Sequence, residues 1–147
     1  LQPAEICTLI DEVGKVHRLK MKENVEFKVV RPEEEIVTVT DRNRVTQVLF
    51  NFLSNAIKNT KQGTITLGMC KEGDWVKLFV RDTGCGISKE KLPLIFTRFE
   101  KLNEFSQGTG LGLTISRAIV EAAGGEVGFT SKLGVGSTFW AWLPLRP

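Results

Sequence analysis

Residues 44–60 read RVTQVLFNFLSNAIKNT, and the apolar side chains in this stretch recur at steps of three and four. Such spacing places side chains along one face of an α-helix. Asp41 precedes the stretch and suits a helix N-cap, because a carboxylate accepts hydrogen bonds from the first free amides. The sequence therefore predicts an amphipathic helix whose apolar face consists of Val45, Val48, Leu49, Phe52, Leu53, Ala56 and Ile57.

The same helix carries a second, polar stripe. At about 100° per residue, five side chains project in one direction. They are Arg44, Gln47, Asn51, Asn55 and Lys58. A solvated outer face alone would explain such residues. Three glycine-rich stretches follow, however, and a phosphate-binding site is the simplest common cause of the two features.

Composition limits the class of protein. With 147 residues and 41% hydrophobic content, residues 1–147 fit a single domain with one continuous core. A net charge of +3, with basic and acidic residues interleaved, does not indicate nucleic-acid binding. Cys7, Cys70 and Cys85 lack metal-type spacing and suit reduced thiols in the cytosol. The sequence has no long apolar run and no initiator Met, so we expect a non-membrane part of a longer protein.

The periodicity before and after the central helix predicts the other elements. We expect a helix over residues 3–19, strands over 24–30 and 36–40, and a hairpin of strands 64–70 and 75–81. His17, the only histidine, lies near the end of the first helix, and we expect it to be an ordinary surface residue.

The C-terminal part of the sequence predicts a short helix at Ser88–Leu92, a mobile surface loop from Glu100 to Gln107 and a helix from the Gly108 loop through Ala123. A hairpin of residues 126–130 and 137–143 closes the chain. We expect this last strand to be central or to contact another domain, because both of its faces are apolar. The core-facing residues of the last helix are predicted to be Leu111, Ile115, Ala118, Ile119 and Ala122.

This order of elements predicts an α+β fold. A mixed β-sheet would pack against about three helices in a two-layer sandwich, rather than in a regular βαβ winding.

Asp82 is an unusual residue at the end of a predicted strand. Val76, Leu78 and Val80 share one face by the period of two, and Asp82 continues that face. A buried carboxylate is costly unless it is hydrogen-bonded. Gly84 and Gly86 follow it and would let the backbone approach a flat ligand. A plain Asp-Thr-Gly turn is the alternative interpretation.

Five stretches, in order, resemble the sequence boxes of one family. Asn51–Lys58 resembles the N box, Asp82–Ile87 the G1 box and Ile95–Phe99 the F box, while Gly108–Leu113 and Gly134–Ser137 resemble the two later glycine boxes. The family is the ATP-binding catalytic domain of sensor histidine kinases, in the superfamily shared with gyrase B, MutL and heat-shock chaperone ATPases. This resemblance implies the Bergerat fold with a mobile ATP lid at about residues 96–107.

The resemblance also implies roles for single residues. Asp82 would accept a hydrogen bond from the adenine amine, and Ser137 would support that contact. Asn55 would hold Mg²⁺ through its amide oxygen with help from Asn51, since Mg²⁺ needs few protein oxygens beside phosphate and water. Lys58 would reach the phosphates.

The lid and the glycine boxes would complete the site. Lys101 would approach the γ-phosphate as a catalytic residue beside Asn51, Asn55 and Lys58, and Arg98 is a further helper. The full ATP-binding set implied by the resemblance is Asn51, Asn55, Lys58, Asp82, Gly84, Gly86, Ile87, Phe96, Phe99, Lys101, Gly108, Thr109, Gly110, Leu111, Gly112, Leu113 and Ser137.

Two residues depart from the family pattern. Asn59 replaces the aromatic residue that often shields the adenine, so stacking from that position is not expected. Cys85 lies between the G1 glycines, either as a modifiable thiol or as an inert small residue.

The resemblance implies that ATP·Mg²⁺ donates its γ-phosphoryl group to a histidine on a separate dimerisation and phosphoacceptor domain upstream. A receiver domain would act downstream, within the same chain if the parent is a hybrid kinase. The parent would be membrane-anchored with this domain in the cytosol, touching neither membrane nor nucleic acid. Hydrolytic relatives carry Glu at the position of Asn51, which favours a kinase. A hydrolytic ATPase module and a nucleotide-binding interaction domain without transfer activity are the alternatives.

Overall fold

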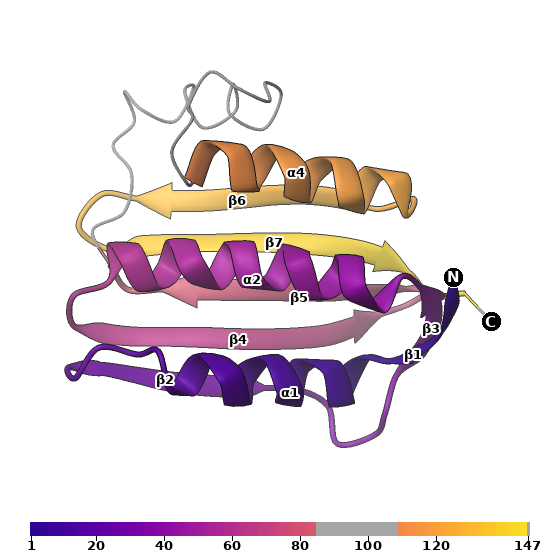
Figure 1. The fold of residues 1–147 in the computed structure, drawn as a ribbon, viewed down its shortest axis with the longest axis horizontal. Helices are drawn as coiled ribbons and strands as arrows, with labels where there is room; N and C mark the ends of the chain where they lie inside the picture. Colours follow the sequence, from indigo (N-terminus) through magenta and orange to yellow (C-terminus); the bar gives the residue numbers. More distant parts are fainter. Residues whose placement is uncertain (85–108, 147) are drawn as a thin grey trace.

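The computed structural model describes residues 1–84 and 109–146, with the backbone alone at 109–112 (Figure 1). The elements in chain order are β1 (Gln2–Glu5), α1 (Ile6–Arg18), β2 (Val25–Val30), β3 (Val37–Thr40), α2 (Arg42–Asn59), β4 (Gly63–Glu72), β5 (Trp75–Asp82), α4 (Thr109–Ala122), β6 (Glu126–Lys132) and β7 (Gly136–Pro144).

Five strands form the main sheet in the order β2-β4-β5-β7-β6. The β2–β4 pair is parallel and the other pairs are antiparallel. Helices α1, α2 and α4 lie side by side over one face of this sheet (Figure 1). The predicted α+β sandwich of a mixed sheet and three helices is therefore confirmed, and β7 is a central strand as predicted.

The opposite face of the sheet carries the other side chains of β7. Trp140 and Trp142 are half-buried there, and the ammonium group of Lys77 lies 5.2 and 5.5 Å from their ring centroids. The long lysine side chain thus covers aromatic surface that the helices do not reach.

The predicted start of the first helix is wrong. Pro3 belongs to β1, which pairs with β3 in a separate two-stranded sheet, and α1 begins only at Ile6. The helical spacing of apolar residues begins at Ile6, and the pairing of Pro3 with Val39 is a long-range contact that local periodicity does not reveal.

Helix α2 has the structure that its sequence predicts. The Asp41 carboxylate accepts hydrogen bonds from the amides of Asn43 and Arg44, at 3.1 and 3.2 Å, and so caps the helix. Ile57 is half-buried. The rest of the predicted apolar face is buried in the core, namely Val45, Val48, Leu49, Phe52, Leu53 and Ala56. This face anchors α2 on the sheet, since burial of each large side chain contributes about 1.5–3 kcal/mol.

The buried face of helix α4 differs in part from the prediction, although Ile119 packs against the core as predicted. Ala118 and Ala122, expected in the core, are exposed, while Leu113, Ser116 and Val120 are buried. Positions 113, 116 and 120 follow the i, i+3, i+7 spacing of one helix face. Because this face includes the polar Ser116, apolar periodicity alone does not reveal it.

His17 is also not where we expected it. Only 1% of the residue is exposed, because it continues the buried face of α1 one turn after Val13. Its Nδ1 lies 2.9 Å from the Val13 carbonyl oxygen, and its ring meets Phe50 edge-on at 4.4 Å. Nε2 has no partner among the described residues. Burial lowers the pKa of His17, the hydrogen bond to Val13 acts against this, and the charge of Lys20 lowers the pKa further.

The buried His17 makes folding depend on pH. Because its pKa is lowered in the folded state, the unfolded chain binds the proton more tightly. Stability from neutral His17 is present above its ordinary pKa of about 6.5 and is lost as pH falls towards the lowered value. We expect the free energy of unfolding, from urea titrations between about pH 5 and 8, to decrease below about pH 6.5 by at most about 1.4 kcal/mol per pH unit. His17→Leu should lack this component, and an identical pH profile for both proteins would contradict the account.

Candidate functional site

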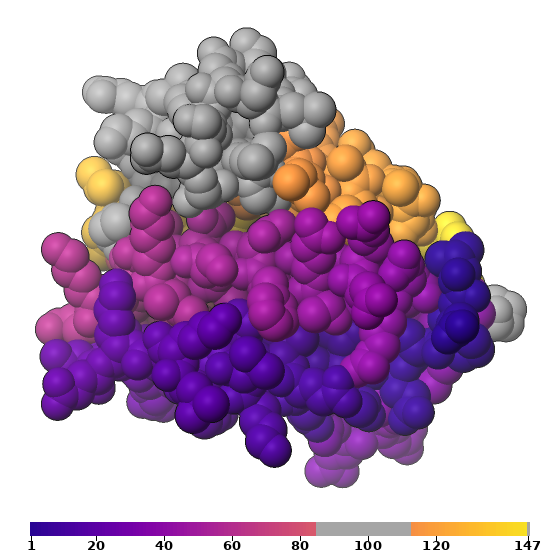
Figure 2. Space-filling view, viewed as in Figure 1, coloured from indigo at the N-terminus to yellow at the C-terminus, as the bar shows by residue number. Residues whose placement is uncertain are grey.

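The described candidate residues converge at one end of the sandwich. The C-terminal half of α2, the end of β5 and the start of β7 lie on the same side of the molecule as the first turn of α4 (Figure 1). In the space-filling view, the surface of α2 crosses the front of the molecule between α1 and α4 (Figure 2). Residues distant in sequence thus surround one region.

Asp82 is the last residue of β5 and points to the helix side of the sheet. Val76, Leu78 and Val80 on the same face are buried, and Asp82 itself is only 4% exposed. Its Oδ1 accepts a hydrogen bond from the Gly84 amide at 2.9 Å. Burial raises the pKa of Asp82, and the backbone amides of Gly84 and Ser137 act against this rise. The carboxylate therefore gains from any further hydrogen-bond donor, including one on a ligand.

Two glycines fit the chain closely around Asp82. At Gly84, a Cβ atom would lie 2.3 Å from the Asn59 carbonyl oxygen, so the loop after β5 packs directly on the end of α2. At Gly136, with φ of +139°, a Cβ would lie 2.0 Å from the Asp82 carbonyl oxygen. Larger side chains at these positions would displace the carboxylate.

Hydrogen bonds to β4 hold the same loop. The Thr83 hydroxyl accepts from the Thr64 amide at 2.9 Å, and the Thr83 amide donates to the Thr64 carbonyl oxygen at 3.1 Å. Across the sheet, Ser137 is the register partner of Asp82, and its hydroxyl lies 2.7 Å from the Ser131 hydroxyl. The pairing of β5 with β7 thus brings Ser137 beside Asp82, and its support of an adenine contact stays a prediction.

The polar side chains of α2 form the second half of the site. Asn55 is only 5% exposed, although it projects from the polar side of the helix. Asn51, one turn earlier, donates from Nδ2 to the Ser116 hydroxyl on α4 at 3.1 Å. Lys58 is exposed. The structure therefore places two amide side chains and one amine on the half of α2 that Gly84 contacts.

Helix α4 begins at Thr109, close to the predicted start, and Gly108 lies outside the described residues. Its first turn contains Gly110, Leu111 and Gly112, whose free backbone amides form the positive end of the helix. The Leu113 side chain is buried in the core, so only its backbone is available to a ligand.

Several predicted residues lie outside the described part of the chain. They are the lid at residues 96–107, the short helix Ser88–Leu92, and Cys85, Gly86, Ile87, Phe96, Arg98, Phe99, Lys101 and Gly108.

The sequence did not single out four residues of this region. Ser116 contacts Asn51, Ser131 contacts Ser137, Thr83 fixes the loop after β5, and Thr60 packs against Gly84. These short polar residues have no informative spacing of their own. Only two positions in the sequence could have pointed to them: Thr83 lies within the G1 box, and Thr60 directly follows α2.

The donor set suits a hard cation that is shared with a ligand. The described residues contain no group of three or more His, Cys, Asp or Glu side chains that could hold a metal ion. The amide oxygens of Asn51 and Asn55 are the neutral oxygen donors in this region. Mg²⁺ commonly takes one or two protein oxygens and completes its shell with phosphate oxygens and water, so these residues fit it.

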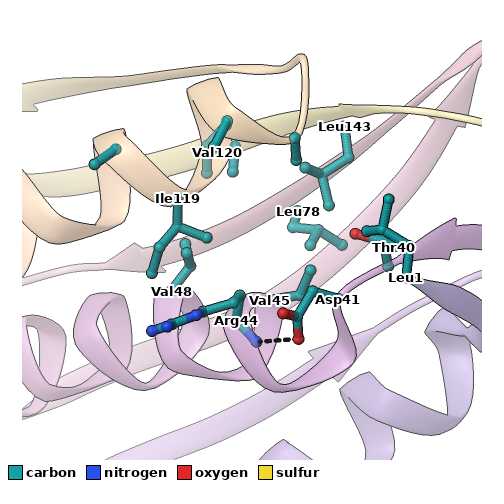
Figure 3. Close-up of a pocket in the computed structure, with 14 residues that line it drawn as sticks. Leu1, Thr40, Asp41, Arg44, Val45, Val48, Leu78, Ile119, Val120 and Leu143 are labelled. Carbon is teal, nitrogen blue, oxygen red and sulfur yellow. Dashed lines mark hydrogen bonds between the residues drawn. The ribbon is translucent and has the colours of Figure 1, made fainter.

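A larger apolar cavity lies elsewhere. It has a volume of about 410 Å³ and is lined by the N-terminal half of α2 and the C-terminal half of α4, including Arg44, Val48 and Ile119 (Figure 3). None of the predicted ATP-binding residues that the structure describes lines it. A cavity of about 320 Å³ adjoins Asp82 and Ser137. We therefore assign the polar region around Asp82 and Asn55 as the candidate site.

Comparisons with known proteins identify the family of this chain. The family model described as histidine kinase-, DNA gyrase B- and HSP90-like ATPase matches residues 40–147. The circadian input-output histidine kinase CikA of Synechococcus elongatus is 41% identical over 109 residues, which are 71% of this chain and 14% of CikA. The chain thus spans a small part of that relative.

Solved structures are similar over the whole chain. The catalytic domain of histidine kinase ThkA is 30% identical with a TM-score of 0.84, covering 99% of this chain and 96% of that chain. Full-length ShkA in complex with AMPPNP is 31% identical with a TM-score of 0.83, covering 99% of this chain and 31% of that chain. The chain belongs to the family of histidine kinase-, DNA gyrase B- and HSP90-like ATPases, as a catalytic domain of the sensor histidine kinase type.

Proposed function

We propose that this domain binds ATP with Mg²⁺ and donates the γ-phosphoryl group to a histidine on a separate dimerisation and phosphoacceptor domain of the same parent protein. One observation carries the proposal: the end of β5, which carries the buried Asp82, and the C-terminal half of α2, which carries Asn51 and Asn55, lie at the same end of the sandwich as the start of α4 (Figure 1). At this end, the Asp82 carboxylate can accept a hydrogen bond from the adenine, and the backbone amides of α4 can donate hydrogen bonds to the phosphates.

At the adenine end, Asp82 accepts a hydrogen bond from the exocyclic amine. Burial makes this bond valuable, because the carboxylate has lost most of its contact with water. Gly84 and Gly136 bring the backbone close to Asp82, while Ser137 lies opposite it in the strand register. The similarity to ShkA, whose structure contains AMPPNP, supports this placement.

At the phosphate end, the residues of α2 and α4 act together. The amide oxygens of Asn55 and Asn51 would hold Mg²⁺, and the ion would neutralise charge on the phosphate oxygens. Lys58 extends towards the phosphates from the end of α2, and the amides of the first turn of α4 accept an anionic oxygen. The family resemblance implies that Lys101 approaches the γ-phosphate and that Gly108 helps to cradle the phosphates.

The transfer step needs a nucleophile from outside this chain. An imidazole nitrogen of the acceptor attacks the γ-phosphorus, a P–N bond forms, and the bond to the β,γ-bridging oxygen breaks to release ADP. His17 is the only histidine of the chain. It lies on α1, where it is buried against Phe50. The acceptor is therefore placed on another domain, from which a receiver domain takes the phosphoryl group.

The parent protein is proposed to be a sensor kinase, of the hybrid type if it carries its own receiver domain. We place this domain on the cytosolic side of a membrane-anchored parent. Among the described residues, no helix is both long enough and apolar enough to span a membrane.

Asn51 favours transfer over hydrolysis. Its amide nitrogen donates a hydrogen bond to Ser116, and a neutral amide cannot remove a proton from an attacking water. The hydrolytic alternative would need another base. A nucleotide-binding domain without transfer activity is the remaining alternative.

Labelled ATP distinguishes these three functions. With γ-labelled ATP and Mg²⁺, we expect no stable label on the 147-residue chain alone and label on an added phosphoacceptor domain of the parent protein. Omission of Mg²⁺ is the control and should abolish transfer. Steady phosphate release without any acceptor would favour a hydrolytic ATPase. Tight ATP binding without transfer would favour a nucleotide-binding domain without transfer activity.

Asp82→Asn separates stability from binding. Loss of the charge-assisted hydrogen bond should weaken ATP binding by about 1.5–3 kcal/mol, or roughly 10–150-fold by calorimetry. The same change should increase the free energy of unfolding at neutral pH, because burial disfavours the ionised carboxylate. The pKa of Asp82 is raised in the folded state, so the fold is stabilised by protonated Asp82 and loses this stabilisation as pH rises through the raised pKa. Unchanged ATP affinity in a folded variant would remove Asp82 from the adenine pocket.

A further inference from the structure

Ser116 is a polar residue within the buried face of α4. It is 0% exposed and lies between Leu113 and Val120, which pack in the core on the same face of the helix. Its hydroxyl accepts a hydrogen bond from Nδ2 of Asn51 on α2 at 3.1 Å. A buried hydroxyl without any partner would be costly, so this contact explains how α4 accommodates a polar group in the core.

Packing gives no reason for a serine at this position. Alanine is of similar size, forms helices better and would bury no polar atom. The contact also adds little to stability, because Asn51 is half-buried and a neutral hydrogen bond contributes only about 0.5–1.5 kcal/mol. The hydrogen bond does, however, restrict the rotamer of Asn51, since it joins the amide to a group that is itself fixed in the core.

The Asn51 amide is a group whose position matters for the proposed function. Asn51 and Asn55 are one turn apart on α2, and their amide oxygens are neutral ligands that fit Mg²⁺. Because Mg²⁺ demands near-ideal geometry, a ligand that is already held in place binds it better than one that must first be ordered. Removal of a residue that orients a metal ligand typically costs about 10–100-fold in metal affinity.

We propose that Ser116 is a positioning residue for Mg²⁺: its hydroxyl, fixed in the core by α4, holds the Asn51 amide so that its oxygen acts with that of Asn55 on the ion shared with ATP. This inference rests on the proposed function, because it takes Asn51 and Asn55 as the metal ligands. Ser116 is fully buried, so it acts through Asn51 and not by direct contact with the ion or the nucleotide.

Calorimetric titrations of the 147-residue chain with ATP, in Mg²⁺ and in EDTA, test this role. Ser116→Ala should weaken ATP binding about 10-fold in Mg²⁺, the lower end of the range for such residues, and leave binding in EDTA unchanged. Ser116→Cys replaces the hydroxyl by a poor acceptor of similar size and should show the same selective loss. The matched control Val120→Ala, on the same buried face, should lower thermal stability and change neither affinity.

Two further measurements show whether Ser116 acts through Asn51. Asn51→Ala should cause the Mg²⁺-dependent loss of affinity, and the addition of Ser116→Ala to it should cause no further loss. In the absence of nucleotide and metal, NMR should show slower solvent exchange of the Asn51 side-chain NH₂ group in wild type than in Ser116→Ala, because the variant lacks the hydrogen bond to this group.

Three results would overturn the assignment. The first is equal weakening of ATP binding in Mg²⁺ and in EDTA, which would make Ser116 a purely structural contact between two helices. The second is wild-type affinity in both Ser116 variants, and the third is additive losses in the double variant. A wild-type chain that binds ATP no better in Mg²⁺ than in EDTA, or not at all, would instead overturn the proposed function, so the two failures are distinguishable.

Discussion

The burial of one carboxylate at the end of an apolar strand face constrains the rest of this structure. Asp82 continues the buried row of β5 and has little contact with water. Its neighbours compensate in part: the Gly84 amide donates to it, and both Gly84 and Gly136 leave room for close backbone contact. The remaining cost is recovered when a ligand offers a donor. Stability and binding are thus in opposition at this residue.

Helix α2 connects this carboxylate to the proposed phosphate end of the site. Its apolar face is fixed in the core, and its C-terminal half presents Asn51 and Asn55. The end of the helix also contacts Gly84, so the same rigid element sets the distance between the two ends of the site. Segments far apart in the sequence meet at this site. The pairing of Asp82 with Ser137 places the glycine box Gly134–Ser137 beside the end of β5.

Much of this arrangement could be predicted from the sequence, and the reasons differ between elements. Some features are local patterns. The cap of α2 is confirmed by its hydrogen bonds, and the apolar face of α2 and the alternation along β5 are confirmed by burial. The strand pairing of Pro3 could not be predicted, because it depends on residues more than thirty positions away. His17 was misplaced because residue type was given more weight than its spacing from Val13. Part of the buried face of α4 could not be predicted, because it contains the polar Ser116.

The central claim is that Asp82, Asn55 and the start of α4 bind different parts of one nucleotide. Titration of the isotopically labelled chain with ATP and Mg²⁺, followed by NMR, tests this most directly. The Gly84 and Ser137 amides and the Asn55 side-chain amide should all shift with one common dissociation constant. Tripolyphosphate should shift Asn55 and the first turn of α4 while leaving Gly84 and Ser137 unchanged. ATP-induced shifts that leave out Gly84 and Ser137, or that follow two unrelated dissociation constants, would contradict the account.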